Sequence, residues 1–112
     1  MLAMAAVLAT LEAIEADAMI ENARAFENSI REELSDASGI VAIHGKGCLL
    51  GIEFDGPCSP AHKKLLDGRV ITGTSSAPNV LRLLPPLCVD VVEAVERMKS
   101  ILSEQIITEA AA

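Results

Sequence analysis

Arg82 is the residue whose surroundings point most directly to chemistry. It lies in a strand-like run, residues 80–84, that is otherwise apolar on both faces. A guanidinium cannot shed its charge, so a buried one needs a carboxylate or another acceptor. The sequence supports two interpretations equally: a structural ion pair with Glu53, which is similarly isolated, and a clamp for a ligand carboxylate. Either way, we expect Arg82 to be largely buried, with Glu53 as its ion-pair partner when no ligand is present.

Two histidine–cysteine pairs offer metal-binding side chains. His44 and Cys48 are four residues apart, and so are Cys58 and His62. Four extended residues separate two backbone positions by about 13 Å, too far for ligands that approach one zinc ion within roughly 2.0–2.3 Å. We therefore expect no metal site, with Cys48 a buried strand residue and His44 a surface one. Three cysteines without an export signal favour reduced thiols over a disulfide framework.

No nucleophile can be matched with a general base on a known template. The chain has four lysines: Lys46, Lys63, Lys64 and Lys99. They fall in a turn or on solvated helix faces, whereas an imine-forming lysine sits in a desolvated pocket. The Gly45-Lys46-Gly47 motif is not a phosphate-binding loop, because no helix opens after it and no hydroxyl follows the lysine. These patterns predict no catalytic residue.

The first element is helical. Residues 2–34 contain no proline or glycine and are rich in helix-forming types, which predicts one long helix or two with a kink near Asp17. The first half of this segment is apolar on nearly every face, so it requires cover from more than one side.

The remainder, residues 35–112, has a mixed pattern. Residues 39–54 predict two strands joined by the Gly45-Lys46-Gly47 turn. A short helix follows, with Ser59 as its N-cap, and it ends at Gly68. Residues 70–72 and 80–84 predict two more strands, separated by a polar loop. Asp90 begins a last helix with one apolar face, formed by Val91, Val95, Met98 and Leu102. We predict one α+β domain over residues 1–112: a small, mostly antiparallel sheet of three to four strands, covered by helices and preceded by the long N-terminal helix.

Composition excludes several function classes. The chain of 112 residues carries a net charge of −7 and only two aromatic residues, which argues against nucleic-acid binding. Its longest apolar run, residues 1–11, is far shorter than the ~20 residues of a membrane span, and no basic residue precedes it as in a secretory signal. We expect a soluble cytoplasmic chain with neither nucleic-acid nor membrane partners.

Four segments in a fixed order carry a family resemblance: residues 2–15, 21–24, 45–54 and 79–87. They include the Gly-Lys-Gly turn at 45–47 and the Arg-Leu-Leu-Pro-Pro-Leu sequence at 82–87. From Leu2 to about Leu102 the chain resembles the C-terminal part of class-III pyridoxal-phosphate-dependent aminotransferases, acetylornithine and ornithine branch. The resemblance implies that the first helix ends the large domain of such an enzyme. The rest would be the small C-terminal domain that leans over the active site.

The resemblance also implies roles for particular residues. The family arginine before Leu-Leu-Pro-Pro-Leu binds the substrate carboxylate, and that role maps onto Arg82, while His44 stands where an arginine is usual. Nothing in the chain matches the imine-forming lysine, the phosphate-binding loop or the aspartate that pairs with the pyridinium nitrogen. Because such protein groups hold and tune the cofactor, we expect this chain alone to bind no pyridoxal phosphate.

Three functional hypotheses follow. The first is a stand-alone or truncated aminotransferase C-terminal domain, catalytically incompetent alone, that serves as an interaction or carboxylate-binding module. The second is one subunit of a split aminotransferase, completed by a separate large-domain chain. The third is an unrelated carboxylate binder that uses Arg82. The apolar first helix further predicts a homo-oligomer, most simply a two-fold dimer.

Overall fold

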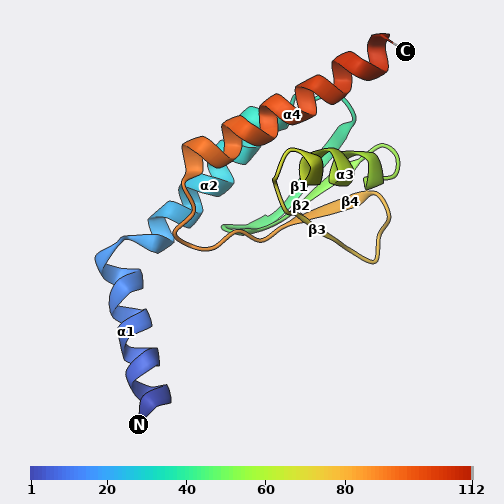
Figure 1. Cartoon of the computed structure of the whole chain (residues 1–112). Coiled ribbons are helices and arrows are strands. Elements are labelled where there is room, and N and C mark those ends of the chain that lie inside the picture. Colours follow the sequence, from blue (N-terminus) through green and yellow to red (C-terminus); the bar gives the residue numbers. More distant parts are fainter. Residues whose placement is uncertain (112) are drawn as a thin grey trace.

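The computed structural model describes the backbone of residues 1–111 and the side chains of residues 1–103. In this part of the chain helices and strands follow in the order α1 (Leu2–Ala16), α2 (Met19–Leu34), β1 (Ile40–Lys46), β2 (Leu49–Phe54), α3 (Ser59–Asp67), β3 (Gly73–Thr74), β4 (Val80–Leu83) and α4 (Val91–Ala111). The strands form one antiparallel sheet in the order β1-β2-β4-β3 (Figure 1). The predicted α+β fold is confirmed.

The long N-terminal helix is broken in two, as the sequence indicated. The break falls at Asp17 and Ala18, where Ala18 takes the left-handed conformation with φ of +50°. The N–H of Asp17 still donates to the carbonyl of Ala13, so α1 ends in a regular turn before the chain changes direction. The break lets α2 pack on the sheet while α1 points away from it (Figure 1).

One hydrophobic core joins the sheet to α2, α3 and α4. Alternate residues of β2 and β4 face it, and each helix contributes one buried stripe. The buried residues of the strands and helices are Leu50, Ile52, Leu81, Leu83, Ala23, Phe26, Ile30, Leu34, Ala61, Leu65, Val95, Met98 and Leu102. The predicted apolar face of the last helix is therefore confirmed at Val95, Met98 and Leu102, which are buried.

The other face of the sheet carries exposed or half-buried residues: Ala42, His44, Gly51, Glu53, Gly73, Val80 and Arg82. We call this surface the open face. The strand register decides which side chains meet there, because neighbours across the strands point to the same side.

The last helix and the fourth strand begin as predicted, and α3 ends as predicted at Gly68. The Asp90 carboxylate accepts a hydrogen bond from the N–H of Glu93 at 3.2 Å and caps α4. The predicted cap of α3 was wrong by one residue, because Ser59 already lies in the helix and Cys58 is its N-cap.

The third strand lies later than predicted. Residues 70–72 pair with no strand, and β3 is Gly73–Thr74. The N–H of Val70 instead donates to Leu65 O at 2.7 Å, and that of Arg69 to Leu66 O at 2.9 Å. These two bonds form a Schellman closure of α3, with Arg69 at φ +65° in the position that glycine usually takes. The chain reaches the sheet only after leaving this turn.

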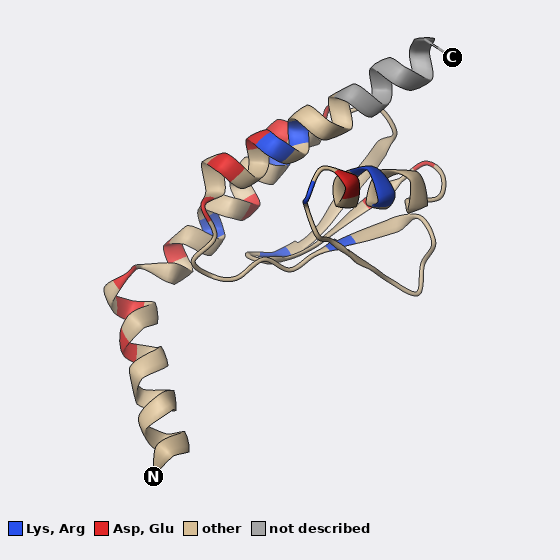
Figure 2. Cartoon of the chain, in the orientation of Figure 1, with Lys and Arg blue, Asp and Glu red and all other residues tan. Residues whose placement is uncertain are grey.

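Helix α1 has no buried residue and projects from the rest of the molecule (Figure 1). Its first half carries no charged side chain, and acidic residues appear only near its end (Figure 2). The radius of gyration is 15.9 Å, against about 13 Å for a compact domain of this length. The accessible surface is 7256 Å², against about 5,900 Å² for a compact monomer of this mass. The uncovered helix contributes to both differences.

Among the described residues, no helix combines the length and the apolar character needed to cross a lipid bilayer.

Candidate functional site

Arg82 lies near the middle of the open face. In the strand register it is opposite Gly51 of β2 on one side and Gly73 of β3 on the other. His44 of β1 is opposite Gly51 from the far side, and Glu53 lies two residues further along β2. The sheet therefore brings His44, Glu53 and Arg82 to one surface, grouped around two glycines.

Arg82 is exposed, so the expectation that it is buried was wrong. The run 80–84 looked apolar on both faces, but only Leu81 and Leu83 point into the core, and Leu84 is 65 % exposed. Among residues 1–103, nothing buries this part of the open face. Within residues 1–103 no hydrogen bond or ion pair reaches the Arg82 guanidinium.

Glu53 pairs with His44 instead of Arg82. The distance from His44 Nε2 to Glu53 Oε2 is 3.0 Å, and the two side chains are 62 % and 34 % exposed. The expected ion pair of Glu53 with Arg82 is thus replaced, although the two residues do share a face. Sequence reasoning missed His44 as the partner because the contact depends on register across two strands, in which His44 is opposite Gly51 and Ala42 is opposite Glu53.

The Arg82 side chain lies over Gly73. A Cβ atom placed on Gly73 would be 3.1 Å from Arg82 Nε and 3.3 Å from Nη2. The guanidinium is therefore directed toward the edge strand β3, whereas Glu53 lies on β2, the strand on the opposite side of β4. The two side chains therefore share the open face but are directed toward opposite neighbouring strands.

A second polar network holds the β1–β2 hairpin on α2. Arg31 donates to Ile43 O at 2.8 Å and to Gly45 O at 2.9 Å, and its Nε donates to Glu27 Oε2 at 3.0 Å. Glu27 Oε1 accepts the N–H of Gly47 at 2.8 Å. The Gly47 N–H, and then Arg31, lower the pKa of the Glu27 carboxyl. Two carbonyls that flank His44 are thus fixed by one arginine.

The sequence signal for this network was the four-residue spacing of Glu27 and Arg31 on one helix, which brings the two side chains together. Their long-range targets could not be read from the chain.

The histidines and cysteines do not form a metal centre. Cys48 is buried and His44 is exposed, as predicted, and burial raises the pKa of the Cys48 thiol. His62 Nδ1 lies 3.0 Å from Thr72 Oγ1. Within the described residues, no three side chains of the metal-binding types gather at one point.

Lys46, Lys63 and Lys99 lie in environments that do not fit an imine with pyridoxal phosphate. Lys46 and Lys63 are exposed. Lys99 donates to Glu33 Oε2 at 2.6 Å, and this hydrogen bond raises the pKa of its ammonium group. An imine-forming amine needs the opposite environment, one that lowers its pKa. The Gly45-Lys46-Gly47 turn also leads into β2 rather than into a helix, so no helix N-terminus is available there to hold a phosphate.

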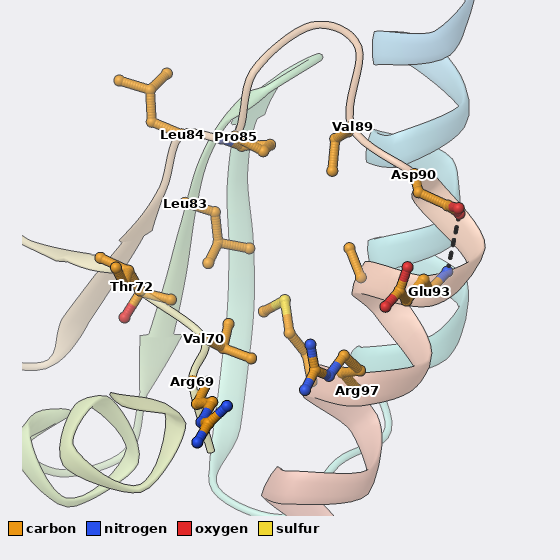
Figure 3. A pocket seen from close by; sticks show the side chains of 13 residues that line it. Arg69, Val70, Thr72, Leu83, Leu84, Pro85, Val89, Asp90, Glu93 and Arg97 are labelled. Carbon is orange, nitrogen blue, oxygen red and sulfur yellow. Dashed lines mark hydrogen bonds between the residues drawn. The ribbon is translucent and has the colours of Figure 1, made fainter. Parts of the chain in front are cut away.

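A cavity of about 340 Å³ lies between residues 69–72, residues 83–85 and the start of α4 (Figure 3). Its wall is mostly apolar. Arg69 and Arg97 line it together with Asp90 and Glu93. Arg82 is not part of this cavity, so the structure does not bring the sequence-predicted arginine together with these four charged residues.

Comparison with known proteins identifies the family. The model of the family described as "Aminotransferase class-III" matches residues 1–105. Acetylornithine aminotransferase of Listeria innocua is 38% identical over 91 residues, covering 77% of this chain and 23% of that protein. Acetylornithine aminotransferase of Bacillus subtilis is 36% identical over 109 residues, covering 92% and 28%. The chain thus spans about a quarter of the length of the curated relatives it matches.

Solved structures show the same fold. The crystal structure of acetylornithine aminotransferase from Elizabethkingia anophelis matches with a TM-score of 0.71 at 19% identity, covering 87% of this chain and 27% of that one. Plasmodium falciparum ornithine delta-aminotransferase matches with a TM-score of 0.68 at 26% identity, covering 84% and 27%. From the family match over residues 1–105, the chain belongs to the class-III aminotransferases.

Proposed function

We propose that this chain supplies the carboxylate-binding part of an acetylornithine-type class-III aminotransferase, through Arg82, and that it catalyses no transamination alone. The observation that supports the proposal is the position of Arg82: an exposed guanidinium on the open face, with no ion-pair partner among residues 1–103. Such a guanidinium can bind a carboxylate through two parallel hydrogen bonds. The relatives' names supply the substrate class, an amino acid with a free carboxylate.

A titration tests the role of Arg82. Glutarate, a simple dicarboxylate, is added to the ¹⁵N-labelled chain at constant ionic strength, and the arginine Nε–H signals are followed by NMR. We expect the Arg82 signal to shift and saturate, and Arg82→Ala to weaken binding at least tenfold, because a hydrogen bond to a charged group contributes about 1.5–3 kcal/mol. Arg24→Ala, which removes another exposed arginine, is the matched control. Equal affinity in wild type and Arg82→Ala would overturn the proposal.

The cofactor belongs to a different part of such an enzyme in this proposal. The chemistry that pyridoxal phosphate supplies is electron withdrawal from the substrate carbon. Lys46, Lys63 and Lys99 offer no desolvated amine to hold it, because the first two are exposed and the third is hydrogen-bonded to Glu33. Our proposal is a stand-alone or truncated C-terminal domain, and the alternative is one subunit of a split enzyme whose large domain is a separate chain.

Visible absorbance of a cofactor imine separates these two forms. The chain alone should give no stoichiometric, borohydride-trappable label on a single lysine. An imine that appears only after mixing with a chain that carries the missing large domain would favour the split enzyme. Stoichiometric labelling of one lysine in the chain alone would contradict both.

We further propose that the chain forms a homo-oligomer, most simply a dimer, through α1. Leu2, Met4, Val7, Leu8 and Leu11 are between 55% and 86% exposed. Covering ~500 Å² more per chain, or about 1,000 Å² in the pair, would favour association by roughly 25 kcal/mol at about 25 cal/mol per Å². The opposing cost is about 4–15 kcal/mol for lost translation and rotation, together with the ordering of interface side chains. A two-fold pair is the commonest closed arrangement for such a surface.

We also propose that the chain is located in the cytoplasm. It is supported by the three cysteines, Cys48, Cys58 and Cys88, all of which are free thiols. Reduced thiols are typical of proteins from reducing compartments.

A further inference from the structure

The surroundings of Arg82 contain a competitor for its guanidinium. Glu53 and Arg82 are diagonal neighbours on adjacent strands, since Glu53 is opposite Val80 and Arg82 is opposite Gly51. Diagonal neighbours on one face lie about 7–8 Å apart at Cβ, within reach of two long side chains. An ion pair between them would occupy the edge of the guanidinium that a ligand carboxylate needs.

Two features of the open face oppose that pair. His44 holds the Glu53 carboxylate, with 3.0 Å between His44 Nε2 and Glu53 Oε2, on the side of β2 away from β4. Gly73 leaves room for the Arg82 side chain to lie over β3, because even a single Cβ there would be 3.1 Å from Arg82 Nε. The hydrogen bond to His44 directs Glu53 toward β1, and the absence of a side chain at Gly73 lets Arg82 lie toward β3.

We propose that His44 and Gly73 are positioning residues that keep the Arg82 guanidinium free of Glu53 and so available to a substrate carboxylate. The inference rests on the proposed carboxylate-binding role of Arg82. It explains why an arginine and a glutamate on the same face, two positions apart in register, do not pair. It also assigns a role to the glycine in β3, a strand only two residues long.

The test compares three changes by the glutarate titration described above. In His44→Ala the released Glu53 should pair with Arg82 and weaken glutarate binding about two- to fivefold, the range that an exposed ion pair provides. The same His44→Ala change should have no effect in a Glu53→Gln background. A weakening that persists with Glu53→Gln would overturn the inference, because it would show a role of His44 independent of the acid.

Gly73→Val tests whether the space above Gly73 keeps Arg82 away from Glu53. The added side chain should push the guanidinium off β3 toward Glu53. The nuclear Overhauser contact between Arg82 Hε and the Hα of residue 73 should then disappear. Glutarate binding should weaken in the presence of Glu53 but not in a Glu53→Gln background. Gly56→Val is the matched control, since a Cβ at Gly56 meets nothing within 4 Å. Equal affinities in Gly73→Val and Gly56→Val would overturn the role of Gly73.

A readout without ligand separates this inference from the proposed function. Pairing with Glu53 should slow the exchange of the Arg82 Nε proton with water in His44→Ala, relative to wild type and to His44→Ala with Glu53→Gln. If this slowing occurs but wild type binds no glutarate, the positioning holds and the carboxylate-binding role fails. If wild type binds glutarate through Arg82 and exchange is unchanged in His44→Ala, the carboxylate role holds and the positioning inference fails.

Discussion

Two glycines in the β1–β2 hairpin should respond very differently to the same substitution. Gly45 has φ of +104°, and a Cβ there would clash with Leu49 O, a backbone atom of the paired strand that cannot move aside. Gly47 has φ of +59°, in the ordinary left-handed region, and its Cβ would make a normal 3.6 Å contact with the Ala23 Cβ.

The magnitudes follow from these surroundings. Gly45→Ala combines backbone strain of about 1–3 kcal/mol with a steric displacement of about 1–3 kcal/mol, so we expect a loss of about 2–6 kcal/mol in the free energy of unfolding. Gly47→Ala carries only the left-handed penalty of about 1–2 kcal/mol. Domains of this size have a total stability of about 5–15 kcal/mol, so the first variant should lose a large part of it.

The assay is urea unfolding followed by far-ultraviolet circular dichroism, because the chain has no tryptophan or tyrosine for fluorescence. The two variants carry the same chemical change two residues apart, so helix content and net charge are matched. Equal losses for Gly45→Ala and Gly47→Ala, or a larger loss for the second, would refute the hairpin geometry on which the position of His44 depends.

Three further outcomes are expected. Arg69→Gly should raise the free energy of unfolding by about 1 kcal/mol in urea titration, because glycine removes the left-handed strain at the C-terminal closure of α3; a destabilised variant would contradict that turn. The pKa of Glu27 is lowered in the folded chain, so its stabilising contribution is present above the pKa of the unfolded chain and is lost as pH falls through the folded value. Glu27→Gln should therefore flatten the acid limb of stability measured below about pH 5, and an unaltered acid limb would count against the Gly47 and Arg31 contacts. Val7→Glu combined with Leu11→Glu should dissociate the proposed dimer in sedimentation at high micromolar concentration; unchanged assembly, or a wild-type monomer, would rule out a seam along α1.

The elements set by local chemistry could be predicted from the sequence. The glycine turn at 45–47, the Asp90 cap and the apolar stripe on α4 depend on residues close together in the chain, and all three were found. The third strand could not be placed, because the closing turn of α3 uses Arg69 where a glycine would have been the recognisable signal.

The candidate site could likewise be predicted only in part from the sequence. Arg82 and Glu53 lie on one face of the sheet, but the sequence-based expectation made them an ion pair and placed Arg82 in the interior, and both points were wrong. Burial of a strand residue depends on whether a second layer covers that face, and pairing depends on register across strands. Neither is encoded within the five or six residues around Arg82. Similarly, the contacts of Arg31 with two hairpin carbonyls required the tertiary packing of α2.

A crystal structure of the chain soaked with glutarate would show which arginine binds a carboxylate. Two arginine-lined places compete for the ligand: Arg82 on the open face, and the cavity lined by Arg69 and Arg97. We expect a glutarate carboxylate on the Arg82 guanidinium, with two N···O distances of about 2.7–2.9 Å and with Glu53 still hydrogen-bonded to His44. Glutarate bound between Arg69 and Arg97 with Arg82 empty, or Arg82 turned onto Glu53, would contradict this expectation.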